Sequence, residues 1–375
     1  MKFSSPRLPL LDSLLAVSRA LSNRTALPAL GGIMLEASVG PEGESGLLSF
    51  KATDSEMSLT CSCAAQVEIP GKQLLPGRLL IEVVKALPDG SVEFESRAEY
   101  RDVEVRAGSA QFHLRTLLAE DFPPLPIPAE DPIKLPAAAF AATIERVIVA
   151  ASNDEVRPIL TGILIQAEES NLVMVATDSY RLCVKQTTLD SPVVEVFEAV
   201  IPARALRELA RLVDHDEPDG KIEISMLGSQ IVFNLGEALL SSRLIDGQFP
   251  SYKQLIPEAF DYDLKLGREE FLEVAKRVRH LAQRQVPLKL TFSEGELEVA
   301  AETPDLGDAR DALPVPFEGD PLEIAFNPKY LIEGIENVRG DEIFMKISSP
   351  LRPGLLVGTG DEEFRYLVMP IRLNV

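Results

Sequence analysis

The 375-residue sequence predicts an α+β protein made of three repeated domains, each with two helices packed on antiparallel sheets. A proline-led amphipathic segment recurs at Pro76, Pro202 and Pro328, so both intervals are 126 residues, about a third of the chain. Alternating apolar and polar residues, typical of half-buried strands, fill most of the sequence between these segments. Hydrophobic residues make up 46% and charged residues 25% of the chain, as in ordinary globular proteins.

Six helices are expected, two in each repeat, because one apolar-periodic segment opens each repeat and a second begins near each proline. Two helices cannot cover both faces of the sheets in a repeat, so the helices are expected on one side. The expected helices lie at 8–21, 75–87, 137–152, 201–209, 267–284 and 327–335. The expected strands lie at 47–63, 92–117, 172–187, 222–245, 288–301 and 343–373.

Shorter motifs repeat with nearly the same period. The Ala-Thr-Asp-Ser of 52–55 recurs at 176–179, and the Phe-Pro of 122–123 recurs at 249–250. The proline-rich stretch 122–128 and the segment after Pro257 are typical of joints between domains. These marks predict three domains, with the boundaries 1–128, 129–257 and 258–375.

Composition also limits the class of protein. No apolar run is long enough for a membrane-spanning helix, and the first residues lack the features of a signal peptide, so a cytoplasmic location is expected. Three cysteines, Cys61, Cys63 and Cys183, are typical of a reducing compartment. No Cys/His cluster has the spacing of a zinc site and no Gly-rich phosphate loop is present, so no metal or cofactor is expected.

Three groups could carry catalytic or metal chemistry. Asp54 and Asp178 recur at equivalent places and could act as a carboxylate pair, but a turn-stabilising role for each is favoured. Cys61 and Cys63 share one strand face without a second ligand pair. His215 stands between two aspartates in a polar, turn-rich stretch, which favours a solvated loop over a catalytic base. We therefore expect no enzymatic activity.

Positive charge is concentrated in the helices. The chain carries a net charge of -21, yet the six helical segments sum to +9, which leaves -30 for the rest. In the helix from 201, Arg204, Arg207 and Arg211 lie opposite the apolar face that contains Leu206 and Leu209. Such a face suits the phosphate backbone of DNA without reading its sequence, although amphipathic helices commonly carry Lys and Arg on solvated faces. The charges counted lie in 1–24, 71–85, 137–151, 201–213, 267–284 and 327–339.

Four motifs in one register resemble the bacterial β sliding clamp family, the processivity subunit of DNA polymerase III. They are Leu-Pro-Ala-Leu-Gly at 27–31, Ala-Thr-Asp-Ser-Tyr-Arg-Leu at 176–182, Asp-Gly-Gln-Phe-Pro-Ser-Tyr at 246–252 and Tyr-Leu-Val-Met-Pro-Ile-Arg-Leu at 366–373. The resemblance implies three similar domains, and two chains joined head to tail as a ring around duplex DNA. It also implies a non-enzymatic tether for the polymerase III catalytic subunit. Other implied partners are the clamp loader, further polymerases and repair proteins.

Two candidate sites follow from the charge pattern and the resemblance. The DNA-binding residues are expected to be Arg24, Arg78, Arg157, Arg204, Arg207, Arg211, Lys276 and Arg279. The resemblance also implies a cleft between the second and third domains that takes a short, glutamine-led hydrophobic peptide. The expected cleft residues are Leu160, Thr177, Ser179, Tyr180, Arg181, Leu182, Pro250, Leu255, Leu367, Met369, Pro370, Ile371 and Arg372.

The chain departs from the family pattern at a few positions. Ser179-Tyr180 stands where Gly-His is common, and Tyr180 is expected to reshape one part of the cleft. Asp154, Pro158 and Ile159 replace a glutamine and two tyrosines of a DNA-touching loop, so only Arg157 of that loop is carried over. The chain also continues through 374–375, past the usual Arg-Leu ending.

Two points stay open. A hydrolase or transferase with a carboxylate site at a domain interface is the alternative function, disfavoured because no nucleophile, base and orienting group stand together. The ring would have to close through the first and third domains, by edge-strand pairing plus apolar contacts, and 103–114 is the candidate edge.

Overall fold

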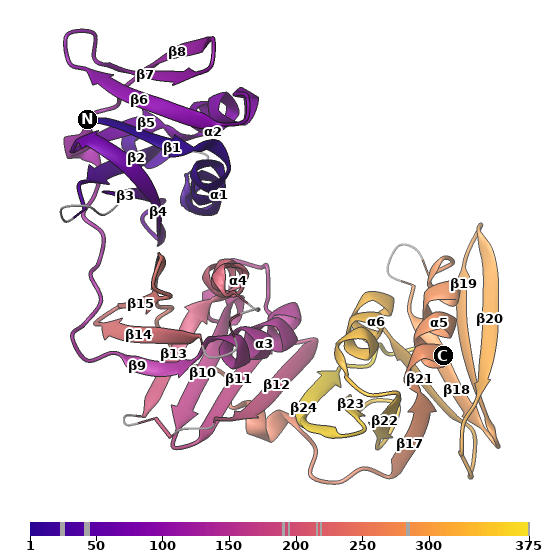
Figure 1. The fold of residues 1–375 in the computed structure, drawn as a ribbon. Helices are drawn as coiled ribbons and strands as arrows, with labels where there is room; N and C mark the ends of the chain where they lie inside the picture. The colour runs from indigo at the N-terminus through magenta and orange to yellow at the C-terminus, as the bar shows by residue number, and fades with distance from the viewer. Residues whose placement is uncertain are drawn as a thin grey trace. The chain divides into compact units, whose positions relative to one another are not determined.

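The computed structural model describes residues 1–22, 27–40, 46–189, 192–193, 196–214, 217, 220–282 and 286–373. Arg24, His215 and the 374–375 tail, all singled out above, lie outside these described residues. The chain forms two compact units, Met1–Ala141 with Arg204–Leu244, and Ala142–Ala203 with Ile245–Val375. Figure 1 labels most of the helices and strands of each unit. Within the described ranges, no helix is both long and apolar enough to cross a membrane.

The first unit is built on one twelve-stranded antiparallel sheet. Its main path runs β8-β7-β6-β1-β4-β16-β15-β14-β9, and β2, β3 and β5 join it through the pairing of β3 with β4. Helices α1 and α2 pack against each other, and α1 covers β4. The strands are β1 (Lys2–Pro6), β2 (Gly32–Ser38), β3 (Gly46–Thr53), β4 (Met57–Ile69), β5 (Gly71–Pro76), β6 (Ser91–Arg97), β7 (Asp102–Ala107), β8 (Ala110–Arg115), β9 (Ile133–Pro136), β14 (Lys221–Leu227), β15 (Gln230–Asn234) and β16 (Ala238–Arg243).

The second unit contains an eight-stranded and a four-stranded antiparallel sheet. The larger sheet has the order β13-β10-β11-β12-β24-β23-β22-β17, and the smaller one β20-β19-β18-β21. The strands are β10 (Gly162–Glu168), β11 (Asn171–Thr177), β12 (Arg181–Thr188), β13 (Phe197–Pro202), β17 (Tyr262–Gly267), β18 (Leu288–Ser293), β19 (Glu296–Thr303), β20 (Gly307–Pro314), β21 (Leu322–Phe326), β22 (Glu342–Ile347), β23 (Gly354–Gly358) and β24 (Asp361–Val368). The predicted α+β class with antiparallel sheets is confirmed.

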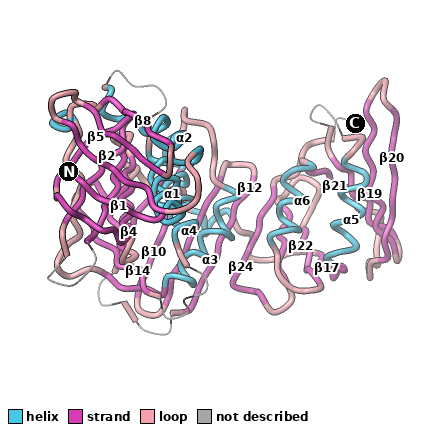
Figure 2. The backbone as a smooth tube through the Cα atoms, turned by 45° about the horizontal axis from the view of Figure 1, so that its top comes forward, coloured by secondary structure: helices cyan, strands magenta, loops and turns pink. Residues whose placement is uncertain are grey.

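All six predicted helices form, and Figure 2 shows them as short cyan segments among the strands. Each buries one apolar stripe; in α5 the stripe consists of Phe271, Val274, Ala275 and Val278, spaced three, one and three residues apart. Helices α5 and α6 pack against each other in the second unit. The helices are α1 (Arg7–Val17), α2 (Gly77–Ala86), α3 (Ala137–Val147), α4 (Ala203–Leu212), α5 (Arg268–Arg279) and α6 (Pro328–Asn337).

The helix ends correct two predictions. Pro76 and Pro202 are the last residues of β5 and β13, directly before their helices, and only Pro328 lies in the first helical turn. The fixed φ of proline suits a strand end as well as a helix start, so the sequence signal could not distinguish the two. The helices predicted at 8–21, 137–152 and 267–284 are also shorter. Two of them tighten into 3₁₀ turns, at Ser18–Ala20 and Ile148–Ala150.

The edge strand predicted at 103–114 is half right. β8 is the terminal strand of the twelve-stranded sheet, whereas β7 is paired on both sides, with β6 and β8. β20 is likewise a terminal strand of the four-stranded sheet. The unpaired backbone groups of β8 and β20 are therefore available to a further strand.

Candidate functional site

The turn between β11 and β12 is built by its own side chains. The Thr177 hydroxyl donates to the carbonyl oxygen of Arg181 (2.7 Å) and accepts the N–H of Ser179 (3.1 Å). Asp178 Oδ1 accepts the N–H groups of Tyr180 (2.9 Å) and Arg181 (3.0 Å). Ser179 has a φ of 77°, in the left-handed region, which is sustained by these surrounding bonds. The predicted turn-stabilising role of Asp178 is confirmed.

The repeated motif forms the same turn between β3 and β4. Thr53 Oγ1 donates to the Met57 carbonyl (2.9 Å), and Asp54 Oδ1 accepts the N–H groups of Glu56 and Met57 (3.1 and 2.9 Å). Ser55 again has a φ of 77°. Both aspartates thus accept backbone N–H groups in their turns, which is the role predicted for each.

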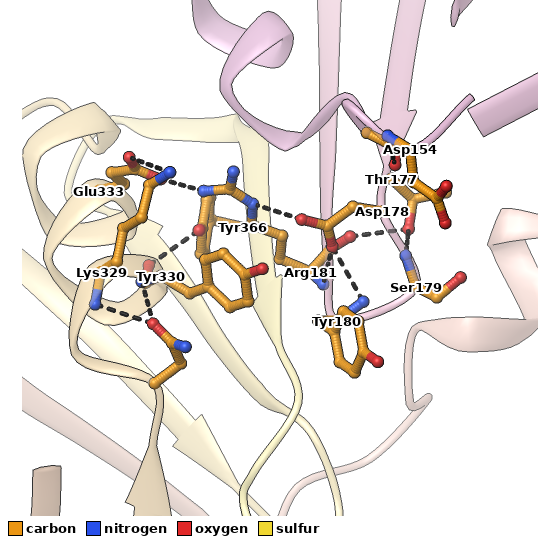
Figure 3. Close-up of polar contacts among 12 residues, drawn as sticks. Asp154, Thr177, Asp178, Ser179, Tyr180, Arg181, Lys329, Tyr330, Glu333 and Tyr366 are labelled. Carbon is orange, nitrogen blue, oxygen red and sulfur yellow. Dashed lines mark hydrogen bonds and ion pairs between the residues drawn. The ribbon is translucent and has the colours of Figure 1, made fainter. Parts of the chain in front are cut away.

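A buried arginine links the turn between β11 and β12 to helix α6 (Figure 3). Arg181 is 6% exposed, its Nε donates to Asp178 Oδ2 (3.0 Å), and its Nη1 forms an ion pair with Glu333 of α6. The guanidinium carbon lies 4.4 Å from the centroid of the Tyr330 ring, also on α6. A buried charge needs such partners, so this network holds α6 against the turn.

An aromatic pair extends from this network to the surface. The ring of Tyr180, 59% exposed, stacks on the ring of Tyr330 with centroids 6.4 Å apart. The Tyr366 hydroxyl donates to the Tyr330 carbonyl oxygen (2.8 Å). Tyr180 therefore occupies a defined place beside α6 and keeps much of its ring exposed.

The strand pair next to the turn carries the apolar part of the site. Leu182 of β12 and Leu367 of β24 are register partners, 2% and 4% exposed. They belong to one apolar cluster with Phe249 and Tyr252. Beyond the strand, the N–H of Met369 donates to the Tyr180 carbonyl oxygen (2.8 Å), which places the exposed Met369 (40%) next to the turn.

The remaining predicted cleft residues are placed around this centre. Leu160 is buried in a 3₁₀ turn (Pro158–Thr161) whose neighbour Ile159 packs on the apolar cluster. Leu255 is exposed at the end of a 3₁₀ turn (Tyr252–Leu255) that begins with a cluster residue. Pro370 forms an isolated β-bridge with Phe326, and the Ile371 N–H donates to the Ala325 carbonyl oxygen (2.7 Å). Pro250 is half-buried, and Ser179 and Arg372 are exposed.

Five contributors were not predicted: Phe249, Tyr252, Tyr330, Glu333 and Tyr366. Tyr330 and Glu333 come from α6, about 150 residues from the turn that they contact, and no local pattern marks them. Phe249 belongs to the apolar cluster, and it had a sequence signal, since it stands in the repeated Phe-Pro motif and in the family motif at 246–252.

A second salt-bridge group holds the other end of the β12–β24 pair. Arg146 of α3 forms an ion pair with Asp361, and Lys185 Nζ lies 3.1 Å from Asp361 Oδ1. The Arg146 guanidinium carbon lies 4.0 Å from the centroid of the Phe364 ring. Burial alone raises the pKa of Asp361, but the hydrogen bonds and charges of Arg146 and Lys185 outweigh it and hold that pKa below its usual range.

In the first unit, the turn at Asp54 and the pairing of β4 with β16 repeat the backbone arrangement of the Asp178 turn and the β12–β24 pair, with different side chains. We call each such combination of turn and strand pair a junction. Ser58 of β4 and Ser241 of β16 are register partners, and their hydroxyl oxygens lie 2.6 Å apart. The N–H of Arg243 donates to the Glu56 carbonyl oxygen (2.9 Å), as Met369 does to Tyr180. Polar groups thus stand where the other junction has two leucines and a methionine.

The predicted DNA-binding residues of α2, α4 and α5 are all exposed, as the helical phase required. Arg204 forms an ion pair with Asp54 and donates to the Arg19 carbonyl oxygen (3.1 Å). Arg211 pairs with Glu208 (2.8 Å) and Lys276 with Glu336 (2.6 Å). Exposed pairs contribute about 0–1 kcal/mol, so these cations remain able to exchange partners. Arg78, Arg207 and Arg279 complete the exposed set.

Arg157 is placed differently from the helix residues. It is exposed in the segment before the Pro158 turn, and its Nη1 donates to the Ser179 hydroxyl (2.9 Å). Its Nε lies 3.9 Å from Asp154 Oδ2. The structure therefore joins this predicted DNA contact directly to the turn of the predicted peptide cleft.

Comparison with known proteins agrees over the whole chain. Family models match the N-terminal, central and C-terminal domains of the DNA polymerase III beta subunit at residues 1–126, 134–251 and 253–372. The predicted threefold organisation is thereby confirmed.

Individual relatives cover nearly the full length. The beta sliding clamp of Synechococcus elongatus is 35% identical over 369 residues, 96% of each chain. The crystal structure of the Bacillus subtilis sliding clamp superimposes with a TM-score of 0.92 at 32% identity, over 100% of both chains. The Pseudomonas aeruginosa DNA polymerase III beta subunit gives 0.90 at 28% identity, again over 100% of both. On these grounds the chain belongs to the DNA polymerase III beta-subunit family, the β sliding clamps.

Proposed function

We propose that this chain is a DNA sliding clamp that tethers the replicative polymerase to duplex DNA for processive synthesis. The observation that carries the proposal is the match of all three family domains along the chain. The exposed arginines of α4 support it, because a row of cations on one helix face can hold phosphates without contacting base edges. The clamp would act without catalysis of its own, in the cytoplasm, through domains at 1–128, 129–257 and 258–375.

The proposed DNA-facing surface is sequence-independent. It includes Arg78, Arg157, Arg204, Arg207, Arg211, Lys276 and Arg279, together with Arg24, which lies outside the described residues. The net charge of -21 would oppose tight binding, so we propose that a closed ring retains the DNA topologically.

The ring would consist of two chains joined head to tail. β8 in the first domain and β20 in the third are terminal strands of their sheets. Pairing β8 of one chain with β20 of the next would satisfy both edges, and two identical junctions of this kind close a dimer.

The proposed protein-binding site is the cleft around Leu182, Leu367, Tyr180 and Met369. An exposed tyrosine and methionine beside buried leucines offer adaptable apolar surface for hydrophobic anchors. The polymerase III catalytic subunit, the clamp loader, other polymerases and repair proteins would bind there through short hydrophobic motifs, and so would compete.

Two measurements test this function. Light scattering in line with size-exclusion chromatography should give a mass near twice 41.0 kDa, and small-angle scattering should show a hollow centre. The Met369→Ala/Pro370→Ala variant should lose about 1–3 kcal/mol of affinity for a glutamine-led hydrophobic peptide while remaining folded. The matched control is Arg243→Ala/Leu244→Ala at the polar junction, which should leave peptide affinity unchanged. A compact monomer at all concentrations, or equal effects of the two variants, would contradict the proposal.

A further inference from the structure

A hollow lies on the same face of the eight-stranded sheet as the apolar cluster. Its volume is about 1070 Å³, and its walls come from β10–β13, β23, β24 and the segment 252–260. Val173, Val184, Leu355 and Val357 contribute apolar surface to it. The last three of these also belong to the cluster that contains Leu182 and Leu367, and Val173 packs against it. We name this hollow the acidic groove, because glutamates are numerous in its lining.

The groove continues from the proposed cleft. Along β12, Leu182 belongs to the cleft, whereas Val184 and Gln186 line the groove. Residues i and i+4 of a strand lie about 13 Å apart, so roughly four extended residues span from one to the other. Tyr252 belongs to the apolar cluster and also lines the groove, where its hydroxyl donates to Gln166 Oε1 (3.4 Å).

Negative charge exceeds positive charge around the groove. Six glutamates and three cationic side chains line it. One cation, Lys346, already pairs with Asp263 outside the lining (2.9 Å), and Glu363 is paired with Lys185 (3.3 Å). Among the described residues, five of the glutamates form no ion pair. These five are Glu168, Glu169, Glu198, Glu258 and Glu362, and Glu198 accepts a hydrogen bond from Gln166 Nε2 (2.7 Å).

We propose that the acidic groove binds lysine or arginine residues that flank the hydrophobic motif of the partner peptide bound in the cleft. The inference rests on the proposed cleft. Long basic side chains can lay their methylene stems on an apolar floor and direct their charged ends to carboxylates at the rim. A partner would thus be selected by its apolar motif and, within about four residues of it, by basic flanking sequence. The contact would weaken with salt, since the carboxylates are exposed.

The probes are six peptides that share one glutamine-led hydrophobic core. The core is extended by four lysines, four serines or four glutamates, with each extension placed at either end in turn. Titrations use the full-length chain. In low salt, one lysine extension should bind about tenfold more tightly than its serine counterpart, and the glutamate extension more weakly. In about 0.5 M salt the three extensions should converge.

Two matched triple variants locate the effect. Glu168→Gln/Glu258→Gln/Glu362→Gln should abolish the lysine advantage and leave the serine peptide unchanged. Glu99→Gln/Glu120→Gln/Glu130→Gln removes the same charge from exposed sites of the first unit and should retain the advantage. Equal loss in both variants would indicate only the general field of an acidic protein and overturn the groove. Binding of the serine peptide without any lysine advantage overturns the groove alone, whereas failure of the serine peptide to bind overturns the cleft and the groove together.

Discussion

Ser55 and Ser179, 124 residues apart in the sequence, adopt the same left-handed backbone conformation, each with a φ of 77°. Each follows an aspartate that accepts two backbone N–H groups, and each precedes a strand that pairs with a distant strand. The internal repeat has therefore preserved one piece of backbone at two junctions. The side chains on this backbone differ between the two junctions, polar at one and apolar at the other, and this difference decides which ligands each junction can bind.

The two aspartates should differ in their contribution to stability. Asp54→Ala removes the acceptor of two backbone N–H groups and should cost about 1–2 kcal/mol in the free energy of unfolding. Asp178→Ala should cost more, because its second oxygen binds the buried guanidinium of Arg181, whereas that of Asp54 binds the exposed Arg204. Urea denaturation of both variants measures the difference. Equal losses of unfolding free energy in the two variants would mean that Glu333 alone compensates the buried charge of Arg181.

Each chain should bind one hydrophobic peptide and no second one. At the first-unit junction, the hydrogen-bonded Ser58–Ser241 pair stands where the other junction has Leu182 and Leu367. An apolar anchor there would leave hydroxyls unpaired, which costs about 1–3 kcal/mol for each buried group. Isothermal titration calorimetry should give a stoichiometry of one peptide per chain.

The control for this stoichiometry is Met369→Ala/Pro370→Ala, which should weaken the measured binding as a whole. A stoichiometry of two, or a residual tight site in that variant, would show that the polar junction also accepts the peptide.

The ion pair of Asp361 should make stability depend on pH in a defined direction. The folded-state pKa of Asp361 is lowered, so its contribution is present above the ordinary aspartate pKa near 4 and is lost as the pH falls through the folded-state value. Asp361→Asn should lower the free energy of unfolding at pH 7 by about 3 kcal/mol, since it leaves Arg146 with an uncompensated buried charge. The gap between wild type and variant should narrow below pH 4.

The control for this measurement is Asp263→Asn, which breaks the exposed pair with Lys346. It should change stability by less than about 1 kcal/mol at pH 7 and have little effect on the pH profile. A constant gap between wild type and Asp361→Asn from pH 7 to pH 3 would contradict the assignment.

Charge reversal on α4 should separate DNA retention from stability. Arg207 is exposed, and Arg207→Glu should weaken DNA retention and reduce its salt dependence without changing the urea midpoint. Arg204→Glu should weaken retention and also destabilise the first unit, because it places a carboxylate beside Asp54 and removes the bond to the Arg19 carbonyl. Retention of the clamp on circular DNA at several salt concentrations, with denaturation of the same samples, gives both quantities. Unchanged retention in Arg207→Glu would remove α4 from the DNA-facing surface.

Much of the architecture was predictable because its causes are local or periodic. The exposed arginines of α4 followed from the 100° rotation per residue, and the Thr-Asp-Ser turns from the tendency of aspartate to bond the backbone two and three residues ahead. Helix ends were less predictable, since Pro76 and Pro202 satisfy a strand end as well as a helix start.

The sequence by itself determined the threefold repeat, the alternation of sheet and helix, the basic helix faces and the turn at Asp178, because each is written within a few residues or within a fixed period. Only the tertiary structure decided that Leu182 meets Leu367, that Arg181 reaches Tyr330 and Glu333, and that a groove lined by glutamates shares residues with the apolar cluster of these two leucines. These contacts join segments more than a hundred residues apart, and strand pairing is specified by hydrogen bonds and packing that form only when the sheet assembles.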